Sequence, residues 1–414
     1  MDSDVQSQGI AATTHGASRV GVDTGIDVSA LVVNYNTAQL ALDMLRSLRD
    51  QKPRAADGRP LRIEWVFVDN ASPVRHEKSL ESIRELANDP ELPGQVILHD
   101  QNAGYAGGMN LAWKHARGTH ALVLNPDLLL LPQCVEQLWQ TLQADPSIGI
   151  VGPVGYWDRG REVLLPPNVL PTLGDLYRGT LAQAFRGANR RYVDRRFRAA
   201  LDVYRSDADI DLPMLSGACL LVSREQIERM GGLFDDGYPL YYEDTDLFRR
   251  ATKSGKRLVM VRRAEIAHFY NRSGTTNPGE AMNRYWRARR YYFSKWYGVV
   301  GRFSEWLCRK FLATKFAERA RARTLHDVID LGDVHAPPTI ELPRHCDSYV
   351  LELCQDRGFL LAAAIPGKGS TWTPGASFWA AFGESEYFLR AVDLTHDEPE
   401  ELGVYRFRRV PAPR

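Results

Sequence analysis

Four apolar runs in the first 130 residues each end on amide or acidic side chains. These side chains are Asn34 and Asn36, Asp69, Asn102, and Asn125 with Asp127. Each one alone is equally well explained as a turn or helix-cap residue, where Asn and Asp are common. The runs alternate with amphipathic helical patterns, which predicts a parallel sheet that binds its ligand at the carboxyl ends of the strands. All four sets of polar residues then fall on that ligand-binding edge.

Three further features of the sequence could bind a cation and move a proton. Asp127 leaves an apolar strand and suits a hard cation such as Mg²⁺ or Mn²⁺, which completes its shell with phosphate oxygens. His268 also ends an apolar run and could complete that site. Glu243 and Asp244 open a helix after two tyrosines, so one of them is a candidate general base. The alternative for these two acids and Asp246 is a favourable interaction with the helix dipole.

A glycine-rich turn follows the third apolar run and leads into a helical pattern. It contains Gly104, Gly107 and Asn110. Its glycines are not in G-x-G-x-x-G order, and it lacks the Lys-Ser/Thr of a P-loop, which disfavours a dinucleotide site. Close approach of the backbone to a ligand is the remaining expectation.

The elements that must position these residues fall into four segments. We expect a disordered tail over 1–27, since it has few large apolar residues, and an α/β domain over 28–279 with a mixed sheet flanked by helices. The pattern HALVLNPDLLL predicts one strand over 120–130. A basic, aromatic helical segment follows over 280–332, and a small β-rich module with turns at 366–367 and 374–375 follows over 333–414.

Composition excludes several classes of protein. The 414 residues carry 52 Lys and Arg against 51 Asp and Glu, a net charge of +1, which argues against a nucleic-acid-coating protein. Five cysteines without a C-x-x-C pair predict reduced, mostly buried thiols rather than a zinc ribbon or a disulfide framework. Without a signal peptide or a long apolar run, we expect a soluble, cytoplasmic protein.

The segment 280–325 interleaves twelve cationic side chains with aromatic ones. This composition is typical of a helix on an anionic membrane surface. The alternative is a helical pair that packs its aromatic residues on the catalytic domain. Trp372, Trp379 and Phe382 of the next segment could stack on sugars, although aromatic residues in a small β module more often form its core.

The ordered motifs VVNYN, VFVDNAS, NAGYAGGMN, LNPD, LSGACLLVSR, GGLFDDGYPLYYEDTDL and AHFYNRSG resemble the family 2 inverting glycosyltransferases of the GT-A fold. They are most similar to a bacterial rhamnosyltransferase-like branch, in which Asn-Pro-Asp replaces Asp-X-Asp. The resemblance covers roughly residues 28–300 and does not reach the C-terminal module.

The resemblance implies roles for individual residues. Asp244 is the expected catalytic base, and Asp127 and His268 are the expected ligands of a divalent cation, Mg²⁺ or Mn²⁺. The remaining matches imply donor or acceptor contacts: Asn34, Asn36, Asp69, Asn102, Gly104, Gly107, Asn110, Asn125 (weak or indirect), Gly217 and Glu243.

The expected activity is transfer of a sugar from a nucleotide-diphosphate donor to a saccharide or lipid-linked acceptor, with inversion, in bacterial surface-polysaccharide assembly. Rhamnose from dTDP-rhamnose is the favoured donor. A UDP-sugar donor and a catalytically silent nucleotide-sugar or carbohydrate-binding component are the alternatives. We expect no nucleic-acid partner, and a location in the cytoplasm, with peripheral contact to the inner face of the plasma membrane through 280–325.

Overall fold

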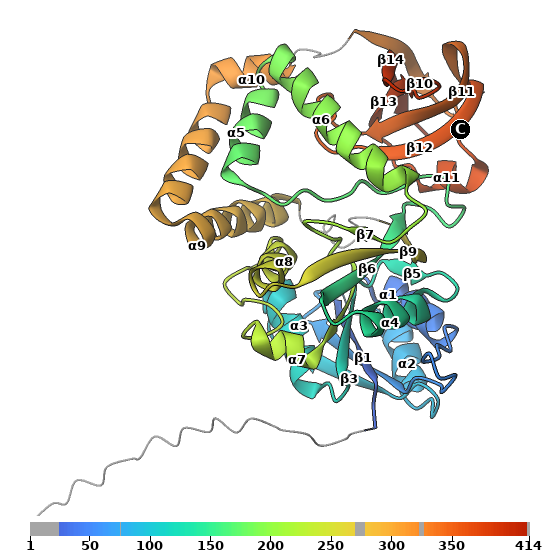
Figure 1. The fold of residues 1–414 in the computed structure, drawn as a ribbon, viewed down its shortest axis with the longest axis vertical. Helices are drawn as coiled ribbons and strands as arrows, with labels where there is room; N and C mark the ends of the chain where they lie inside the picture. Colours follow the sequence, from blue (N-terminus) through green and yellow to red (C-terminus); the bar gives the residue numbers. More distant parts are fainter. Residues whose placement is uncertain (1–24, 75, 270–277, 323–326, 412–414) are drawn as a thin grey trace, which may run out of the picture.

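The computed structural model describes residues 25–74, 76–269, 278–322 and 327–411. Most of the predicted N-terminal tail, residues 1–24, lies outside this range. A large mixed sheet with flanking helices forms the lower half of the molecule in Figure 1, and a second, smaller sheet forms part of the upper half. The predicted fold class, α/β with a helical segment and a β-rich C-terminal module, is therefore confirmed.

The large sheet has the strand order β3-β2-β1-β4-β8-β6-β9-β5, with β7 paired to β9. Its strands are β1 (Val28–Asn34), β2 (Ile63–Asn70), β3 (Gly94–His99), β4 (His120–Leu124), β5 (Leu128–Leu130), β6 (Ile148–Tyr156), β7 (Ile210–Asp211), β8 (Cys219–Ser223) and β9 (Arg257–His268). The helices around it are α1 (Ala38–Arg49), α2 (Glu77–Leu86), α3 (Gly104–His115), α4 (Cys134–Ala144), α7 (Arg224–Arg229) and α8 (Glu243–Lys253).

The pairing of the strands brings the ends of distant segments to one edge. Strands β1, β2, β3 and β4 are mutually parallel, so their carboxyl ends share an edge. Strand β8 runs antiparallel to β4, with Cys219 opposite Leu124, so the residues before β8 lie at the same edge. Strand β6 is antiparallel to β8 and parallel to β9, which returns His268 to that edge as well.

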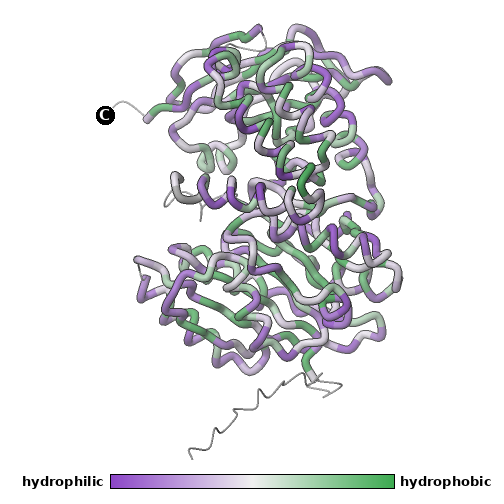
Figure 2. The backbone as a smooth tube through the Cα atoms, turned by 90° about the vertical axis from the view of Figure 1, so that its left-hand side faces the viewer, coloured by the Kyte–Doolittle hydropathy of each residue, from purple (hydrophilic) through white to green (hydrophobic). Residues whose placement is uncertain are grey.

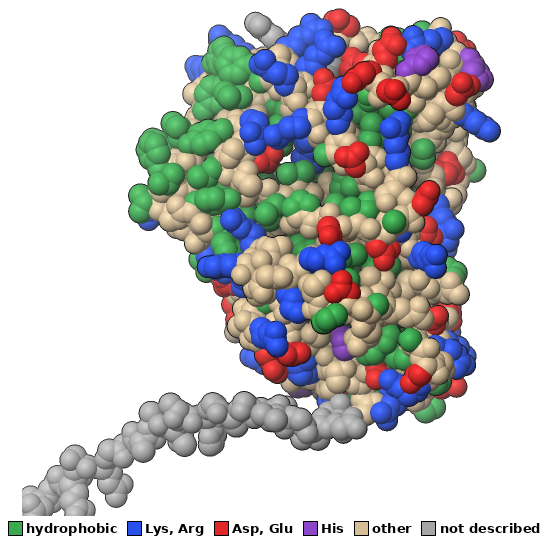
Figure 3. All heavy atoms as spheres, in the orientation of Figure 1, with side chains coloured by type: hydrophobic (Ala, Val, Ile, Leu, Met, Phe, Trp, Pro, Cys, Tyr) green, Lys and Arg blue, Asp and Glu red, His purple; other side chains and the backbone are tan. Residues whose placement is uncertain are grey.

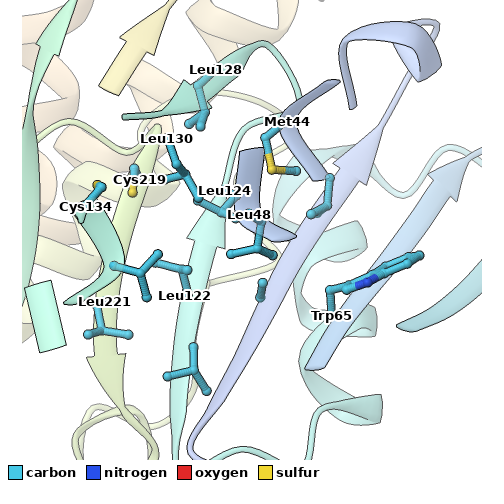
Figure 4. Close-up of a cluster of buried hydrophobic side chains, with 14 of the residues drawn as sticks. Met44, Leu48, Trp65, Leu122, Leu124, Leu128, Leu130, Cys134, Cys219 and Leu221 are labelled. Carbon is cyan, nitrogen blue, oxygen red and sulfur yellow. The ribbon is translucent and has the colours of Figure 1, made fainter. Parts of the chain in front are cut away.

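Apolar residues explain why these segments fold as they do. All seven residues of β1 and all eight of β2 are buried, as expected for strands covered on both faces. Helix α1 buries residues at helical spacing, including Met44 and Leu48, against the sheet. Figure 4 shows these two side chains packed with leucines of β4, β5 and β8, and Figure 2 shows that hydrophobic stretches run through the strands.

The prediction of a single strand over 120–130 is wrong. This segment forms two strands, β4 and β5, separated by Asn125, Pro126 and Asp127. Proline has no N–H to continue a ladder, and after the break the chain pairs with a different neighbour. Leu128 lies opposite His268 in the antiparallel pair of β5 and β9.

Helices that leave the large sheet join the two halves of the molecule. These are α5 (Leu173–Ala182), α6 (Arg186–Arg205), α9 (Pro278–Leu312) and α10 (Lys315–Ala322). Helix α9 is kinked at Gly298, whose φ of 60° and ψ of −141° are not helical. Helix α5 packs along α9, and α6 contacts the C-terminal module through Asn189, which donates to the Gly358 carbonyl at 2.8 Å.

The C-terminal module is a five-stranded sheet in the order β10-β14-β13-β11-β12. Its elements are β10 (Val328–Val334), β11 (Ile340–Cys354), β12 (Ala363–Trp372), α11 (Ala376–Ala381), β13 (Glu386–Asp393) and β14 (Glu400–Arg409). Its first strand therefore begins ahead of the boundary predicted at residue 333. Phe382 belongs to the buried core of the module, and Trp372 and Trp379 pack against it, so these residues form core rather than an open platform.

The turn predicted at 366–367 is wrong, because both residues lie inside strand β12. Strand β12 is an edge strand of its sheet, where proline is tolerated. The ring of Tyr349 on the neighbouring strand lies where a Cβ on Gly367 would be, only 2.4 Å away. The glycine therefore makes room for a tyrosine ring and does not mark a turn.

Two smaller expectations concern thiols and membrane-spanning segments. All five cysteines are free and buried, as predicted. Within the described ranges, none of the helices combines the length and the apolar character that crossing a membrane requires.

Candidate active site

Asp127 and His268 meet at the edge of the large sheet. The Asp127 Oδ1 and His268 Nε2 atoms are 3.3 Å apart, and the two side chains are only 4% and 8% exposed. The pairing of β5 with β9 produces this contact, since Asp127 immediately precedes β5 and His268 ends β9. The Phe269 N–H also donates to the Asp127 carbonyl at 3.0 Å, which fixes the two backbones together.

This pair fits the donor set expected for a divalent cation. One carboxylate and one imidazole are close enough to share an ion, and Mg²⁺ or Mn²⁺ commonly takes few protein ligands and the rest from substrate phosphates. No group of three or more His, Cys, Asp or Glu side chains suited to a metal occurs among the described residues. A cation here would therefore need oxygen atoms from a bound diphosphate.

Asp244 lies in the first turn of α8 and touches the chain just before β8. A Cβ on Gly217 would lie 2.5 Å from the Asp244 Oδ2 atom, so only glycine permits this approach. The Thr245 N–H donates to Asp244 Oδ1 at 2.6 Å. Burial raises the pKa of Asp244, and hydrogen bonds from Thr245 and Gly217 oppose that shift.

Glu243 is the second carboxyl group in this turn. Burial, followed by the neighbouring charge of Asp244, raises the pKa of Glu243 to about 8. Its Oε2 atom is buried and has no hydrogen-bond partner. Near neutral pH the pair therefore holds a proton on Glu243.

The two residues before this turn have strained backbone conformations. Tyr241 and Tyr242 both have φ of 68°, in the left-handed region that side chains with a Cβ rarely adopt. Such strain is found where a side chain must be aimed for a function. Here it turns the chain into α8 so that both acids open the helix at the site.

Tyr105 connects the acids and was not singled out from the sequence. Its hydroxyl donates to Asn125 Oδ1 at 2.8 Å. Its pKa is raised, first by burial and then by the charges of Glu243, Asp244 and Asp127, so all three acids lie around one phenol. The sequence feature that could have indicated Tyr105 as a site residue is the presence of a large aromatic side chain inside a glycine-rich turn.

Asn34 and Asp69 form a buried network at the ends of β1 and β2. Asn34 Nδ2 donates to Asp69 Oδ1 at 2.6 Å, and the Ser72 hydroxyl donates to the same oxygen at 2.6 Å. Asn36 has φ of 61° and carries a buried Nδ2 atom without a partner. The Asn36 amide therefore keeps an unused donor beside this network, and its role in nucleotide binding stays a prediction.

The glycine-rich turn is held against the end of β2. Asn70 Nδ2 donates to Asn102 Oδ1 at 3.2 Å and to the Gly104 carbonyl at 2.9 Å. Gly104 has φ of 74°, and a Cβ there would lie 2.4 Å from the Pro239 carbonyl oxygen. Gly107 is also crowded, since a Cβ would meet Ala103 at 2.8 Å. The turn is thus packed beside the loop that leads to α8.

Asn110 and Asn125 use their side chains within the protein. Asn110 Nδ2 donates to the Phe234 carbonyl at 2.9 Å and to Asp236 Oδ1 at 2.6 Å, and Asn110 Oδ1 accepts from the Phe234 N–H. These contacts position the loop before α8. The Asn125 amide oxygen accepts from Tyr105, which agrees with the indirect role expected for it.

Asp246, in the same turn of α8, was expected only to interact with the helix dipole, but it also anchors the following helix. It is completely buried and accepts hydrogen bonds from Tyr238 Oη at 3.1 Å and Trp296 Nε1 at 2.8 Å. Arg250 and Lys295 form ion pairs with it at 2.9 and 2.7 Å. The third acid of this motif therefore holds α9 onto α8.

The comparisons identify the class of protein that this fold and site define. Residues 29–194 match the model of Glycosyl transferase family 2. This part of the chain is therefore similar to family 2 glycosyltransferases, and it contains the first six strands of the large mixed sheet.

The curated relatives are two N-acetylglucosaminyl-diphospho-decaprenol L-rhamnosyltransferases from two strains of Mycobacterium tuberculosis. Each is 27% identical over 170 residues, which are 39% of this chain and 50% of the relative. The chain thus spans about half the length of the curated relatives it matches. The predicted resemblance, a family 2 domain with rhamnosyltransferase-like relatives, is confirmed.

Solved structures with related folds include a mannosyltransferase from Pyrobaculum calidifontis in complex with GDP-Man and Mn²⁺. It superposes with a TM-score of 0.42 at 20% identity, over 71% of this chain and 74% of that chain. The structure of S. aureus TarS 1–349 superposes with a TM-score of 0.38 at 14% identity, over 72% of this chain and 83% of that chain.

The variant Glu243→Gln tests the buried acid pair in the ligand-free protein. Because the folded pKa of Glu243 is about 8 against 4.5 unfolded, ionisation lowers stability as pH rises from about 4.5 to 8. Glutamine removes that ionisation. We expect the melting temperature of E243Q, relative to wild type, to rise by several degrees between pH 5 and pH 9, measured by calorimetry.

The matched control is Glu81→Gln, on the exposed face of α2. The difference in melting temperature between E81Q and the wild type should not change with pH. If the difference in melting temperature between E243Q and the wild type is also independent of pH, the pKa of Glu243 is not raised.

Proposed function

We propose that this protein is a metal-dependent inverting glycosyltransferase that moves a sugar from a nucleotide-diphosphate donor to a saccharide or lipid-linked acceptor. The observation that carries the proposal is the convergence of Asp127, His268 and Asp244 at one edge of the sheet, around Tyr105. Rhamnose from dTDP-rhamnose is the proposed donor, which the name of the curated relatives supports. Bacterial surface-polysaccharide assembly is the proposed process.

In this proposal, Asp244 accepts the proton of an acceptor hydroxyl. The hydroxyl oxygen forms a bond to the anomeric carbon of the donor, while the bond from that carbon to the phosphate oxygen breaks and the nucleoside diphosphate leaves. With a raised pKa, Asp244 is a stronger base than an exposed aspartate. Glu243 keeps its proton near neutral pH, so one charged carboxylate of the pair serves a single displacement with inversion.

The leaving diphosphate develops negative charge that must be stabilised. Asp127 and His268 would hold the cation, Mg²⁺ or Mn²⁺, which supplies electrostatic stabilisation of the diphosphate when bound. The network of Asn34, Asn36 and Asp69 would contact the nucleoside, and the glycine-rich turn would approach the diphosphate with its backbone.

Asp244→Asn tests the base. Asparagine keeps the shape of the side chain and the acceptor for the Thr245 N–H, but it cannot take the proton. We expect sugar transfer to fall by about 10²- to 10⁴-fold, with nucleotide affinity unchanged, measured by release of nucleoside diphosphate and by calorimetry.

The control is Asp202→Asn, an exposed acid on α6, which should turn over at the wild-type rate. Near-normal transfer by D244N would exclude Asp244 as the base. Absence of transfer by the wild type with every donor, together with intact nucleotide-sugar binding, would favour the silent binding component.

Asp127→Ala tests the metal site and the donor together. A ligand that binds only the folded state stabilises it in proportion to affinity, by about 2.7 kcal/mol at a hundredfold excess over Kd. We expect dTDP-rhamnose with Mn²⁺ to raise the melting temperature of the wild type more than UDP-galactofuranose, UDP-GlcNAc or UDP-glucose does. A chelator should remove most of this shift.

In D127A the metal concentration needed for the shift should rise sharply. A wild-type shift and transfer rate that are insensitive to the chelator would count against the metal site. A larger shift with a UDP-sugar would replace the rhamnose donor but leave the transferase proposal intact.

The proposed location is the cytoplasm, with peripheral contact to the inner face of the plasma membrane through part of 280–325. The kink at Gly298 divides α9 into two arms that differ in burial. Tyr292 and Phe293 of the first arm are buried against the rest of the protein. This arm therefore fits the alternative of packing on the catalytic domain.

The second arm and its neighbours expose apolar side chains on one surface, which we call the α9 patch. Figure 3 shows hydrophobic side chains gathered along the left edge of the upper half, over α5, α9 and α10. The α9 patch comprises Tyr177, Leu181, Phe185, Val299, Val300, Phe303, Trp306, Leu307 and Phe316, each between 39% and 73% exposed. Exposed cations flank it, among them Arg302, Lys310 and Lys315.

The double variant Phe303→Ser with Trp306→Ser tests this contact. Wild-type protein should sediment with vesicles that contain phosphatidylserine, and less so at high salt, because exposed charges are screened. We expect the double variant to lose most of this binding. Leu98→Ser, at another exposed apolar residue, is the control and should bind as the wild type does.

Equal binding by the double variant would place the membrane contact elsewhere. Absence of salt-sensitive binding by the wild type would argue against an anionic membrane partner.

A further inference from the structure

A pocket lies between the catalytic domain and the C-terminal module. Its volume is about 540 Å³, a size usual for binding sites of small molecules. Strands β6 and β9 and residues 212–216 line one side, and the end of β11, Leu361, Ala363 and residues near Tyr387 line the other. Neither part of the chain encloses the pocket alone.

The module is fixed in place on this side by direct contacts with the catalytic domain. Leu164 and Ala364 exchange two backbone hydrogen bonds of 2.8 and 2.9 Å. Trp157 stacks with Phe382 at 6.3 Å between ring centroids, and the Gly375 N–H donates to Glu162 Oε2 at 3.2 Å. Hydrogen bonds and ring stacking therefore hold the two walls of the pocket together.

One end of the pocket reaches the proposed reaction centre. His268, the partner of Asp127, lines it. Ser216 also lines it, and the next residue, Gly217, is the one that touches Asp244. A molecule in the pocket can therefore reach His268 and the residue before Gly217, beside the proposed base.

The walls away from that end are mainly apolar. They include Leu165, Pro167, Leu215, Met260, Leu353 and Leu361. A sugar whose hydroxyls leave water needs hydrogen-bond partners in return. Polar side chains such as Asn168, Arg262 and Gln355 line part of the pocket, but apolar side chains outnumber them. A hydrocarbon chain gains from the same walls in proportion to its buried area.

We propose that this pocket binds the apolar chain of an amphiphilic acceptor, whose sugar hydroxyl then faces Asp244. The inference rests on the proposed transferase function and deepens it, because it commits the acceptor to the lipid-linked class. It also assigns a role to the C-terminal module, which supplies one wall of the acceptor site.

The test uses the full-length chain and alkyl β-D-glucosides as probes, below their micelle concentrations. Affinities of hexyl, octyl and decyl glucoside and of free glucose are measured by calorimetry. The wild type should bind more tightly with each added methylene, up to about fourfold per methylene buried. Free glucose should bind much more weakly.

Leu361→Asp places a carboxylate in the apolar wall. Leu361 is 42% exposed, in the connection between β11 and β12, so the fold should tolerate the change, and an unaltered melting temperature checks this. We expect the affinity of L361D for the glucosides not to increase with alkyl chain length. The affinity of Leu361→Met should increase with chain length, as it does in the wild type. The matched control is Ile329→Asp, at a 51% exposed residue of β10 outside the pocket, which should behave as the wild type does.

Two results would overturn the proposal. One is affinity that does not depend on chain length in the wild type, which would indicate a saccharide or another ligand. The other is the same dependence in L361D as in I329D, which would place the chain elsewhere, such as on the α9 patch. Because binding is read without turnover, these results are distinct from failure of the transferase proposal, which is read by nucleoside diphosphate release.

Discussion

Three carboxyl groups, Asp127, Glu243 and Asp244, bring negative charge to a single edge of the sheet, and the rest of the site offsets that concentration of charge. Glu243 does so by holding a proton, since its pKa is raised to about 8. Asp127 does so by its contact with His268. Asp244 receives hydrogen bonds from Thr245 and Gly217, at the N-terminus of a helix whose dipole favours negative charge. The site thus offsets the charge of each acid with a different neighbour.

The fourth acid of this region, Asp246, links that arrangement to the rest of the molecule. It is buried in the same helical turn and is paired with Arg250 and Lys295. Because Lys295 and its neighbour Trp296 belong to α9, the turn that holds the proposed base also orients the first arm of α9. The second arm, beyond Gly298, is held on α5, where the Tyr177 hydroxyl donates to Ser304 Oγ at 2.7 Å. A membrane that binds the α9 patch would therefore contact both α5 and α9.

The sequence predicted the ends of the strands well and the contacts between distant segments poorly. Polar residues after apolar runs located Asn34, Asp69 and Asp127, because the strand pattern and its end are local properties. Asn110 resembled a ligand-binding residue, yet its partners Phe234 and Asp236 lie 124 and 126 residues away, so its use within the protein was invisible to any local pattern.

The same reasoning explains the failures in the C-terminal half. The proline and glycine at 366–367 are a local turn signal, which the pairing of an edge strand and the ring of Tyr349 overrode. The two arms of α9 have similar composition, and only the docking of the first arm onto α5 and α8 decides which aromatic residues are buried. The C-terminal module supplies one wall of the pocket, and β6 and β9 supply another. A function shared between two parts of a chain leaves no pattern in either part, so it becomes visible only when the fold brings their surfaces together.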